Sequence, residues 1–187
     1  MLGAGESGKA TLSKQMRFLL QGDVLDANEK TRVTEVIQSN LVAYAIVIIE
    51  YAITKDWKWS DDLQSSVTQV DKANRGNSGE IWSPETATAV AALRNSPEFV
   101  RLAHSLHFEE PSQFKHDCGS SSGFWHYATR YLPPPPLKMP TFACDVADVV
   151  CSRVRTTGIV ANAMAVGKGD CGWEAVLTGG QRSERRK

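Results

Sequence analysis

The stretch GAGESGKAT, residues Gly3 to Thr11, decides how the rest of this chain is interpreted. It follows the phosphate-loop pattern G-x-x-x-x-G-K-[ST], except that Ala10 stands where the pattern has Ser or Thr. In such a loop the glycines let the backbone wrap a phosphate group, and successive amide N–H groups point at it. The following helix adds the positive end of its dipole. Taken alone, the stretch fits either a phosphate site or an ordinary turn ahead of a helix.

Composition places the chain among ordinary globular proteins. Its 187 residues include 21 basic and 21 acidic side chains, so no overall charge favours nucleic acid or an anionic membrane. The 4 cysteines form no C-x-x-C pair and show no zinc spacing, which favours reduced thiols in a cytosolic protein. The most apolar run, 41–49, is shorter than the roughly 20 residues of a membrane span.

Apolar periodicity predicts two helices in the first third of the chain. The first covers 11–20 and places Leu12, Met16, Leu19 and Leu20 on one side. The second covers 29–54, and apolar residues recur along it at steps of three and four. They are Val33, Ile37, Leu41, Tyr44, Ile48 and Ala52. Further apolar residues widen this stripe, so we expect the second helix to form the buried centre of a bundle.

Start signals and short apolar runs predict the remaining elements. SPET at 83–86 and SPEF at 96–99 each place a serine at an N-cap and a proline at the first helical position. A short aromatic helix is expected over 123–132 and a last helix over 141–152, whereas 72–79 and 118–123 are interpreted as loops. ANAMAV and WEAVL around GKGDCG predict two short strands joined by a turn.

Three separated motifs resemble the heterotrimeric G-protein alpha subunits. GAGESGK-x-T, continued by LSKQMRFL, is similar to that family's phosphate loop and first helix. SRVRTTGIV at 152–160 resembles its first switch segment, and GGQRSERRK at 179–187 resembles its second. The motifs occur in the family's order, and the helical stretch between the first two agrees with the family's inserted helical domain. The resemblance therefore covers essentially the whole chain.

The resemblance implies a mainly α fold. An all-helical insertion domain is expected at 23–152. It would be flanked by partial segments of a Ras-like P-loop α/β domain: the phosphate loop and first helix at 1–22, and switch I, a β-hairpin and switch II at 153–187.

The resemblance also implies a function: a guanine-nucleotide-binding molecular switch that hydrolyses GTP to GDP and phosphate, with Mg²⁺ as the metal ion. Such a protein transduces signals from G-protein-coupled receptors with a beta-gamma dimer. The expected location is the cytoplasm, or the inner face of the plasma membrane within a heterotrimer. Leu2 occupies the glycine position of an N-myristoylation signal, so the sequence does not support membrane attachment.

Site residues follow from the resemblance, position by position. Arg153 matches the arginine that stabilises charge on the transferred phosphoryl group, and Gln181 matches the glutamine that orients the attacking water. Thr156 matches the switch threonine that binds magnesium. The matched nucleotide-binding residues are Gly3, Gly5, Glu6, Ser7, Gly8, Lys9, Thr11, Arg153, Thr156 and Gly180. Taken singly, Arg153 could equally be a solvated charge at a helix end, and the last residues a basic tail.

Several positions depart from the family. Ala10 has no hydroxyl for magnesium, and Leu177 and Thr178 replace the aspartate and its neighbour in D-x-G-G-Q. No N-K-x-D pattern for reading guanine is present, and only Met1 and Leu2 precede the loop. A weakened magnesium site and impaired hydrolysis are therefore expected. Three alternatives remain: a non-enzymatic helical interaction fragment, the product of an incomplete gene model, and an unrelated P-loop ATPase or kinase.

Overall fold

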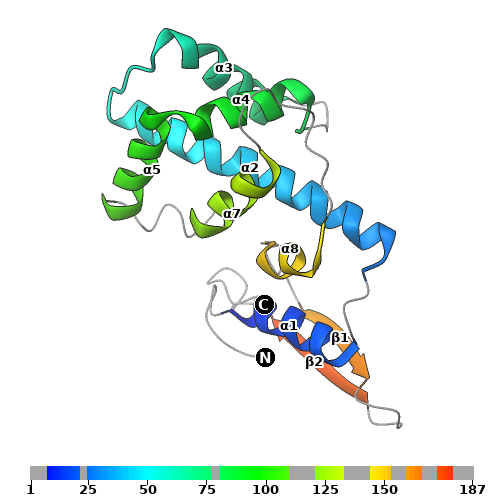
Figure 1. Ribbon diagram of the computed structural model, residues 1–187. Helices are drawn as coiled ribbons and strands as arrows, with labels where there is room; N and C mark the ends of the chain where they lie inside the picture. Colours follow the sequence, from blue (N-terminus) through cyan, green and yellow to red (C-terminus); the bar gives the residue numbers. More distant parts are fainter. Residues whose placement is uncertain are drawn as a thin grey trace. The chain divides into compact units, whose positions relative to one another are not determined.

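The computed structural model describes residues 8–21, 25–76, 81–109, 121–132, 144–152, 159–165 and 172–178. Its elements, labelled in Figure 1, are α1 (Lys9–Gln21), α2 (Ala27–Thr54), α3 (Asp61–Arg75), α4 (Pro84–Asn95), α5 (Pro97–Glu109), α7 (Ser121–Tyr131), α8 (Val146–Cys151), β1 (Ile159–Ala165) and β2 (Gly172–Thr178). The fold is mostly helical, as the sequence predicts.

The chain divides into two compact units. The first is formed by 1–33 together with 144–187, and the second by 34–143. The predicted boundaries at 22 and 152 differ from these limits, and the identification of either unit with a named domain stays a prediction.

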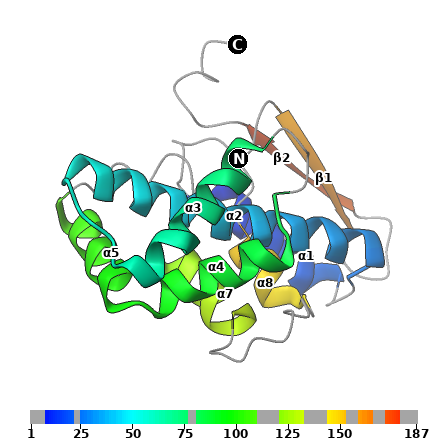
Figure 2. The same cartoon turned by 90° about the horizontal axis from the view of Figure 1, so that it is seen from above.

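The core of the second unit is built around α2. Helices α3, α4, α5 and α7 lie around its later turns (Figures 1 and 2). All six apolar positions predicted for its stripe are buried, and Ile37, Leu41 and Tyr44 are completely so. Full burial of an isoleucine or leucine side chain such as Ile37 or Leu41 stabilises the fold by about 1.5–3 kcal/mol, because its apolar surface is removed from water. The prediction of a buried central helix is confirmed.

α2 also has the length and composition of a membrane-crossing helix. Its most apolar window has a mean hydropathy of 1.7, and it is the single helix among the described residues that meets this test. However, 56% of that window is buried inside the structure. Its apolar side chains therefore contribute to the core of the second unit.

The two serine-proline starts form helices as predicted. The Ser83 Oγ accepts a hydrogen bond from the backbone N–H of Thr86 at 3.2 Å, which caps α4. The Ser96 Oγ accepts from the N–H of Glu98 at 3.1 Å at the start of α5. The apolar residues that recur at helical spacing in α5 are all buried, namely Phe99, Leu102, Ala103 and Leu106. Local capping chemistry thus fixes where both helices begin.

Helix α3 was not expected, and it extends through part of a predicted loop. Asp61 and Asp62 occupy its first turn, where negative charge is favourable, and Lys72 and Arg75 occupy its last turn. Its buried residues are Val67 and Val70. Because so few of its positions are apolar, periodicity gives a weak signal for a helix that packs beside α4.

The first unit contains α1, α8 and a β-hairpin. β1 and β2 pair antiparallel, with Ile159 opposite Thr178 and Ala165 opposite Gly172, so the predicted pair of strands is confirmed. α1 lies beside α8 and beside both strands. α8 is shorter than the predicted 141–152 helix because Asp145 forms its N-cap.

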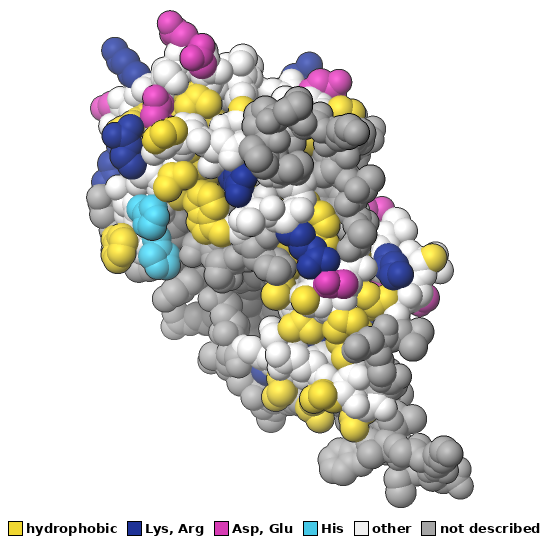
Figure 3. All heavy atoms as spheres, in the orientation of Figure 1, with side chains coloured by type: hydrophobic (Ala, Val, Ile, Leu, Met, Phe, Trp, Pro, Cys, Tyr) yellow, Lys and Arg dark blue, Asp and Glu magenta, His cyan; other side chains and the backbone are white. Residues whose placement is uncertain are grey.

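The predicted apolar side of α1 is largely exposed. Leu12 is 50% exposed and Leu19 is 84% exposed, whereas Ser13 and Phe18 are buried. Figure 3 shows hydrophobic side chains reaching the surface on the face that it presents. Periodicity therefore identified the helix correctly but did not identify its buried side.

Candidate functional site

Of the stretch predicted to form a phosphate loop, the structure describes the last glycine and the residues that begin α1. Gly8 has a φ of +78°, in the left-handed region that glycine adopts without steric cost. Its carbonyl accepts the first helical hydrogen bond, from the N–H of Leu12 at 2.9 Å. Among the described residues, no atom lies within 4 Å of the position that a Cβ at Gly8 would take.

No acidic side chain in the first turn offsets the positive end of the α1 helix dipole. The helix has 13 residues. Lys9 is its first residue and is half-buried, and Thr11 lies exposed in the first turn. Backbone N–H groups, a helix dipole and a lysine are thus brought together at one end of α1, which is an arrangement suited to an anion.

The structure places three of the predicted site residues, Gly8, Lys9 and Thr11, at the N-terminal end of α1. The other predicted residues lie outside the described part of the chain: Gly3, Gly5, Glu6, Ser7, Arg153, Thr156, Gly180 and Gln181. Leu177 and Thr178 are the last two residues of β2, so this strand ends just before Gly180 in the sequence.

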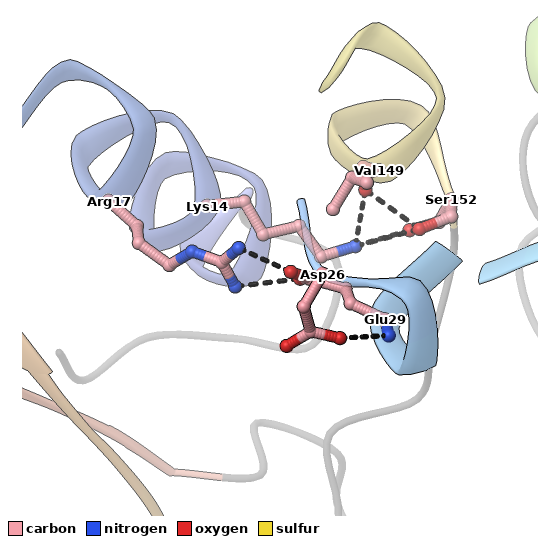
Figure 4. Close-up of polar contacts among 6 residues, drawn as sticks. All are labelled: Lys14, Arg17, Asp26, Glu29, Val149 and Ser152. Atoms are coloured by element: carbon pink, nitrogen blue, oxygen red, sulfur yellow. Dashed lines mark hydrogen bonds and ion pairs between the residues drawn. The ribbon is translucent and has the colours of Figure 1, made fainter. Parts of the chain in front are cut away.

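A cluster around Lys14 was missed by the sequence reasoning (Figure 4). The Lys14 Nζ donates hydrogen bonds to the carbonyl of Val149 at 2.8 Å, to the carbonyl of Ser152 at 2.6 Å, and to the Ser152 Oγ at 3.1 Å. Burial lowers the pKa of Lys14 from 10.5 to about 8, against a smaller opposing influence from Cys151 and Glu29. α1 is thereby joined to the end of α8.

Hydrogen bonds close both ends of α8. At its start, the Asp145 side chain accepts from the N–H of Asp148 at 3.0 Å, and the Asp148 side chain accepts from the N–H of Asp145 at 2.9 Å. At its end, the N–H of Ser152 donates to the carbonyl of Asp148 at 2.7 Å. Ser152 is 4% exposed and immediately precedes Arg153 in the sequence.

A second cationic residue of α1 binds the first turn of α2. The Arg17 guanidinium donates to both carboxylate oxygens of Glu29 at 2.7 and 2.6 Å, as Figure 4 shows. This hydrogen-bonded pairing with Glu29 raises the pKa of Arg17. The Asp26 side chain in turn accepts from the N–H of Glu29 at 2.7 Å. These bonds hold the start of α2 against α1.

The residues present fit a phosphate group better than they fit a magnesium ion. Gly8 and the first turn of α1 supply the backbone donors and positive dipole that a phosphate needs. The position after Lys9 supplies no ligand, because Ala10 carries only a methyl group. Within the described ranges, no three His, Cys, Asp or Glu residues are placed to hold a metal ion.

Comparison with known proteins identifies the family. The sequence model of the G-protein alpha subunit matches residues 1–187. The guanine nucleotide-binding protein subunit alpha of Sporothrix schenckii is 30% identical over 191 residues, which cover 100% of this chain and 49% of that protein. The alpha-1 subunit of Neurospora crassa is 28% identical, with the same two shares.

This chain spans about half the length of the curated relatives that it matches. The family match extends over every residue of it and includes the glycine-lysine pair at the start of α1. The chain therefore belongs to the G-protein alpha subunit family.

Proposed function

We propose that this chain is a guanine-nucleotide-binding switch that hydrolyses GTP slowly. The observation that carries the proposal is the left-handed Gly8 directly ahead of α1, with Lys9 as the first helical residue. This backbone geometry presents the helix N-terminus to an anion, and the family membership indicates that the anion is a guanine nucleotide.

The proposed nucleotide site uses both ends of the chain. Lys9 would neutralise charge on the terminal phosphates, beside backbone donors of the loop from Gly3 to Gly8 and the Thr11 hydroxyl. Arg153 would stabilise charge on the transferred phosphoryl group, while Gln181 would orient the attacking water. The remaining proposed nucleotide contacts are Thr156 and Gly180.

Magnesium supplies charge neutralisation between the last two phosphates in enzymes of this kind. Ala10 does not fit that role, which leaves Thr156 as the proposed metal ligand. We therefore expect slower hydrolysis and a weaker dependence of binding on magnesium than a hydroxyl at position 10 would give.

The proposed partners are a beta-gamma dimer and a G-protein-coupled receptor. The proposed location is the cytoplasm, or the inner face of the plasma membrane within a heterotrimer. Family membership supports these proposals, since the alpha subunit is one part of such an assembly.

Titration with a fluorescent GTP analogue, with and without magnesium, tests the proposal. We expect saturable micromolar binding by the parent chain. Lys9→Met should weaken binding roughly 10- to 100-fold, because a hydrogen-bonded charge on the phosphates is lost. Ala10→Ser should increase the dependence on magnesium by restoring a hydroxyl. No saturable binding by the parent chain would refute the proposal, and equal competition by ATP would show that the site does not select guanine over adenine.

A non-enzymatic helical interaction fragment is the second candidate. It is favoured by the separate core of the second unit, where Leu93, Phe99 and Leu132 are fully buried. This candidate predicts a melting temperature that does not change with GTP. A rise in melting temperature with added GTP would contradict it, because only a ligand that prefers the native state shifts the unfolding equilibrium.

A further inference from the structure

The hydrogen bonds of Lys14 converge on one point, the C-terminal end of α8. Its ammonium group meets two backbone carbonyls and one hydroxyl there, at 2.8, 2.6 and 3.1 Å. An ammonium has three N–H donors, so these acceptors use all of them. The acceptors belong to Val149 and Ser152, which lie 135 and 138 residues away in the sequence.

The chemistry of a helix end explains why this contact matters. The last carbonyls of a helix have no intrahelical partner and carry the negative end of the dipole, so a buried cation stabilises them. α8 has only 6 residues, which is too short to be stable on its own. The Ser152 Oγ also donates to the carbonyl of Val149 at 2.7 Å, which draws the acceptors of Lys14 together.

We propose that Lys14 is a positioning residue that fixes the C-terminal end of α8, and with it the point from which the chain continues into Arg153. Arg153 directly follows Ser152, and the Ser152 carbonyl that accepts from Lys14 belongs to the peptide bond between them. The stated role of Arg153 rests on the proposed function. The role of Lys14 in holding α8 rests on the contacts themselves.

Arg17 offers a matched control on the same helix. It is also a partly buried cation of α1, but its guanidinium is bonded to Glu29 at the start of α2. Arg17→Met therefore removes a comparable charged side chain from α1 without removing a bond to α8.

Hydrogen exchange measured by mass spectrometry tests the structural half of the proposal. Lys14→Met should raise exchange about tenfold or more in peptides that cover 146–152. Lys14→Arg keeps the positive charge but replaces the three converging donors of the ammonium with a planar guanidinium, so it should restore protection only in part. Arg17→Met should leave these peptides unchanged. Ser152→Ala removes one acceptor and keeps Lys14, so it should give a smaller increase in the same peptides. If Lys14→Met unfolds the whole first unit, the exchange of the Ser152→Ala variant decides whether Lys14 anchors α8.

A double-mutant cycle on single-turnover GTP hydrolysis tests the functional half. Lys14→Met should slow hydrolysis roughly 10- to 100-fold, because a small misplacement of a catalytic group has an effect of this size. The dissociation constant of the GTP analogue should change by less than about threefold, since a positioning residue acts on the reaction rather than on binding. In an Arg153→Ala background, Lys14→Met should have no further effect on the rate.

Each outcome supports or overturns one part of the proposal for Lys14. Unchanged exchange over 146–152 in both Lys14→Met and Ser152→Ala would overturn the anchoring of α8. Locally raised exchange with fully additive effects on hydrolysis would overturn the route through Arg153. If the parent chain binds and hydrolyses no GTP, the proposed function and the role of Arg153 fail, and the exchange pattern alone decides whether Lys14 holds α8.

Discussion

Substitutions at Gly8 test whether the start of α1 has the left-handed backbone that a phosphate loop needs. The series is Gly8→Asn, Gly8→Ala and Gly8→Val. Asparagine tolerates positive φ better than other residues with a side chain, alanine tolerates it less well, and a β-branched residue tolerates it least. Asparagine should therefore destabilise the protein least, alanine more, and valine most.

The magnitude follows from the geometry of Gly8. A left-handed conformation costs a residue with a Cβ about 1–2 kcal/mol. No clash with the described residues is added, because an ideal Cβ at Gly8 would meet none of their atoms within 4 Å. Alanine also lowers the entropy of the unfolded chain, which offsets about 0.4–1 kcal/mol. The net loss in free energy of unfolding for Gly8→Ala is therefore about 1 kcal/mol.

Native-state hydrogen exchange in increasing urea measures this loss where it arises. The amides of α1 report on the first unit, and the amides of α4, which belong to the second unit, serve as the internal control. An alanine chain more stable than the glycine chain by about 0.4–1 kcal/mol would show that φ at position 8 is negative, because only the effect on the unfolded chain would then remain. A loss above about 3 kcal/mol for alanine would show a steric clash that none of the described residues produces.

Three other predictions concern charge, packing and capping. The folded pKa of Lys14, about 8, lies below its ordinary 10.5, so the unfolded chain binds more protons between these values. The unfolding free energy of the parent chain, compared with that of Lys14→Met, should therefore rise by about 2–3 kcal/mol from about pH 7 to about pH 10. Urea titrations that show the same difference between the two chains at every pH would contradict this. Phe99→Ala should cost about 3–5 kcal/mol in urea unfolding, because Phe99 is 0% exposed, and Phe108→Ala, at a position 78% exposed, should cost under about 0.5 kcal/mol. Ser83→Ala should cost about 1 kcal/mol in a thermal melt through loss of the α4 cap, and Ser83→Asp should retain most of that stability.

Much of the second unit could be predicted because its signals are local. The apolar stripe of α2 is regular, since one continuous side of this helix faces the core, and every predicted position of the stripe is buried. The caps of α4 and α5 depend on residues within three positions of each other, so sequence spacing is sufficient to find them.

The errors have physical causes. α3 has few buried positions, so a polar sequence concealed a regular helix. On α1, the leucines that mark an apolar side are exposed, and the small polar Ser13 is buried instead. Periodicity detects a side of a helix, but the neighbours available in the fold determine whether that side is covered.

Some residues of the candidate site could be predicted from the sequence, and others could not. Gly8 and Lys9 were identifiable because a phosphate loop is a contiguous motif, and the structure places them at the start of a helix. Lys14 was not identifiable, because two of its acceptors are backbone carbonyls, which every residue has, and they lie more than a hundred residues away. The roles of Arg153, Thr156 and Gln181 stay predictions.

The first unit is assembled from two distant stretches of chain, which has a consequence for its synthesis. Lys14 leaves the ribosome 135 residues before Val149, its partner in α8. At about 5–20 residues per second, that separation corresponds to roughly 7–27 s of translation. The whole second unit, 34–143, emerges within this interval and can complete its own core. Residues 9–21, which form α1, must therefore wait through this interval before Lys14 can bind the end of α8.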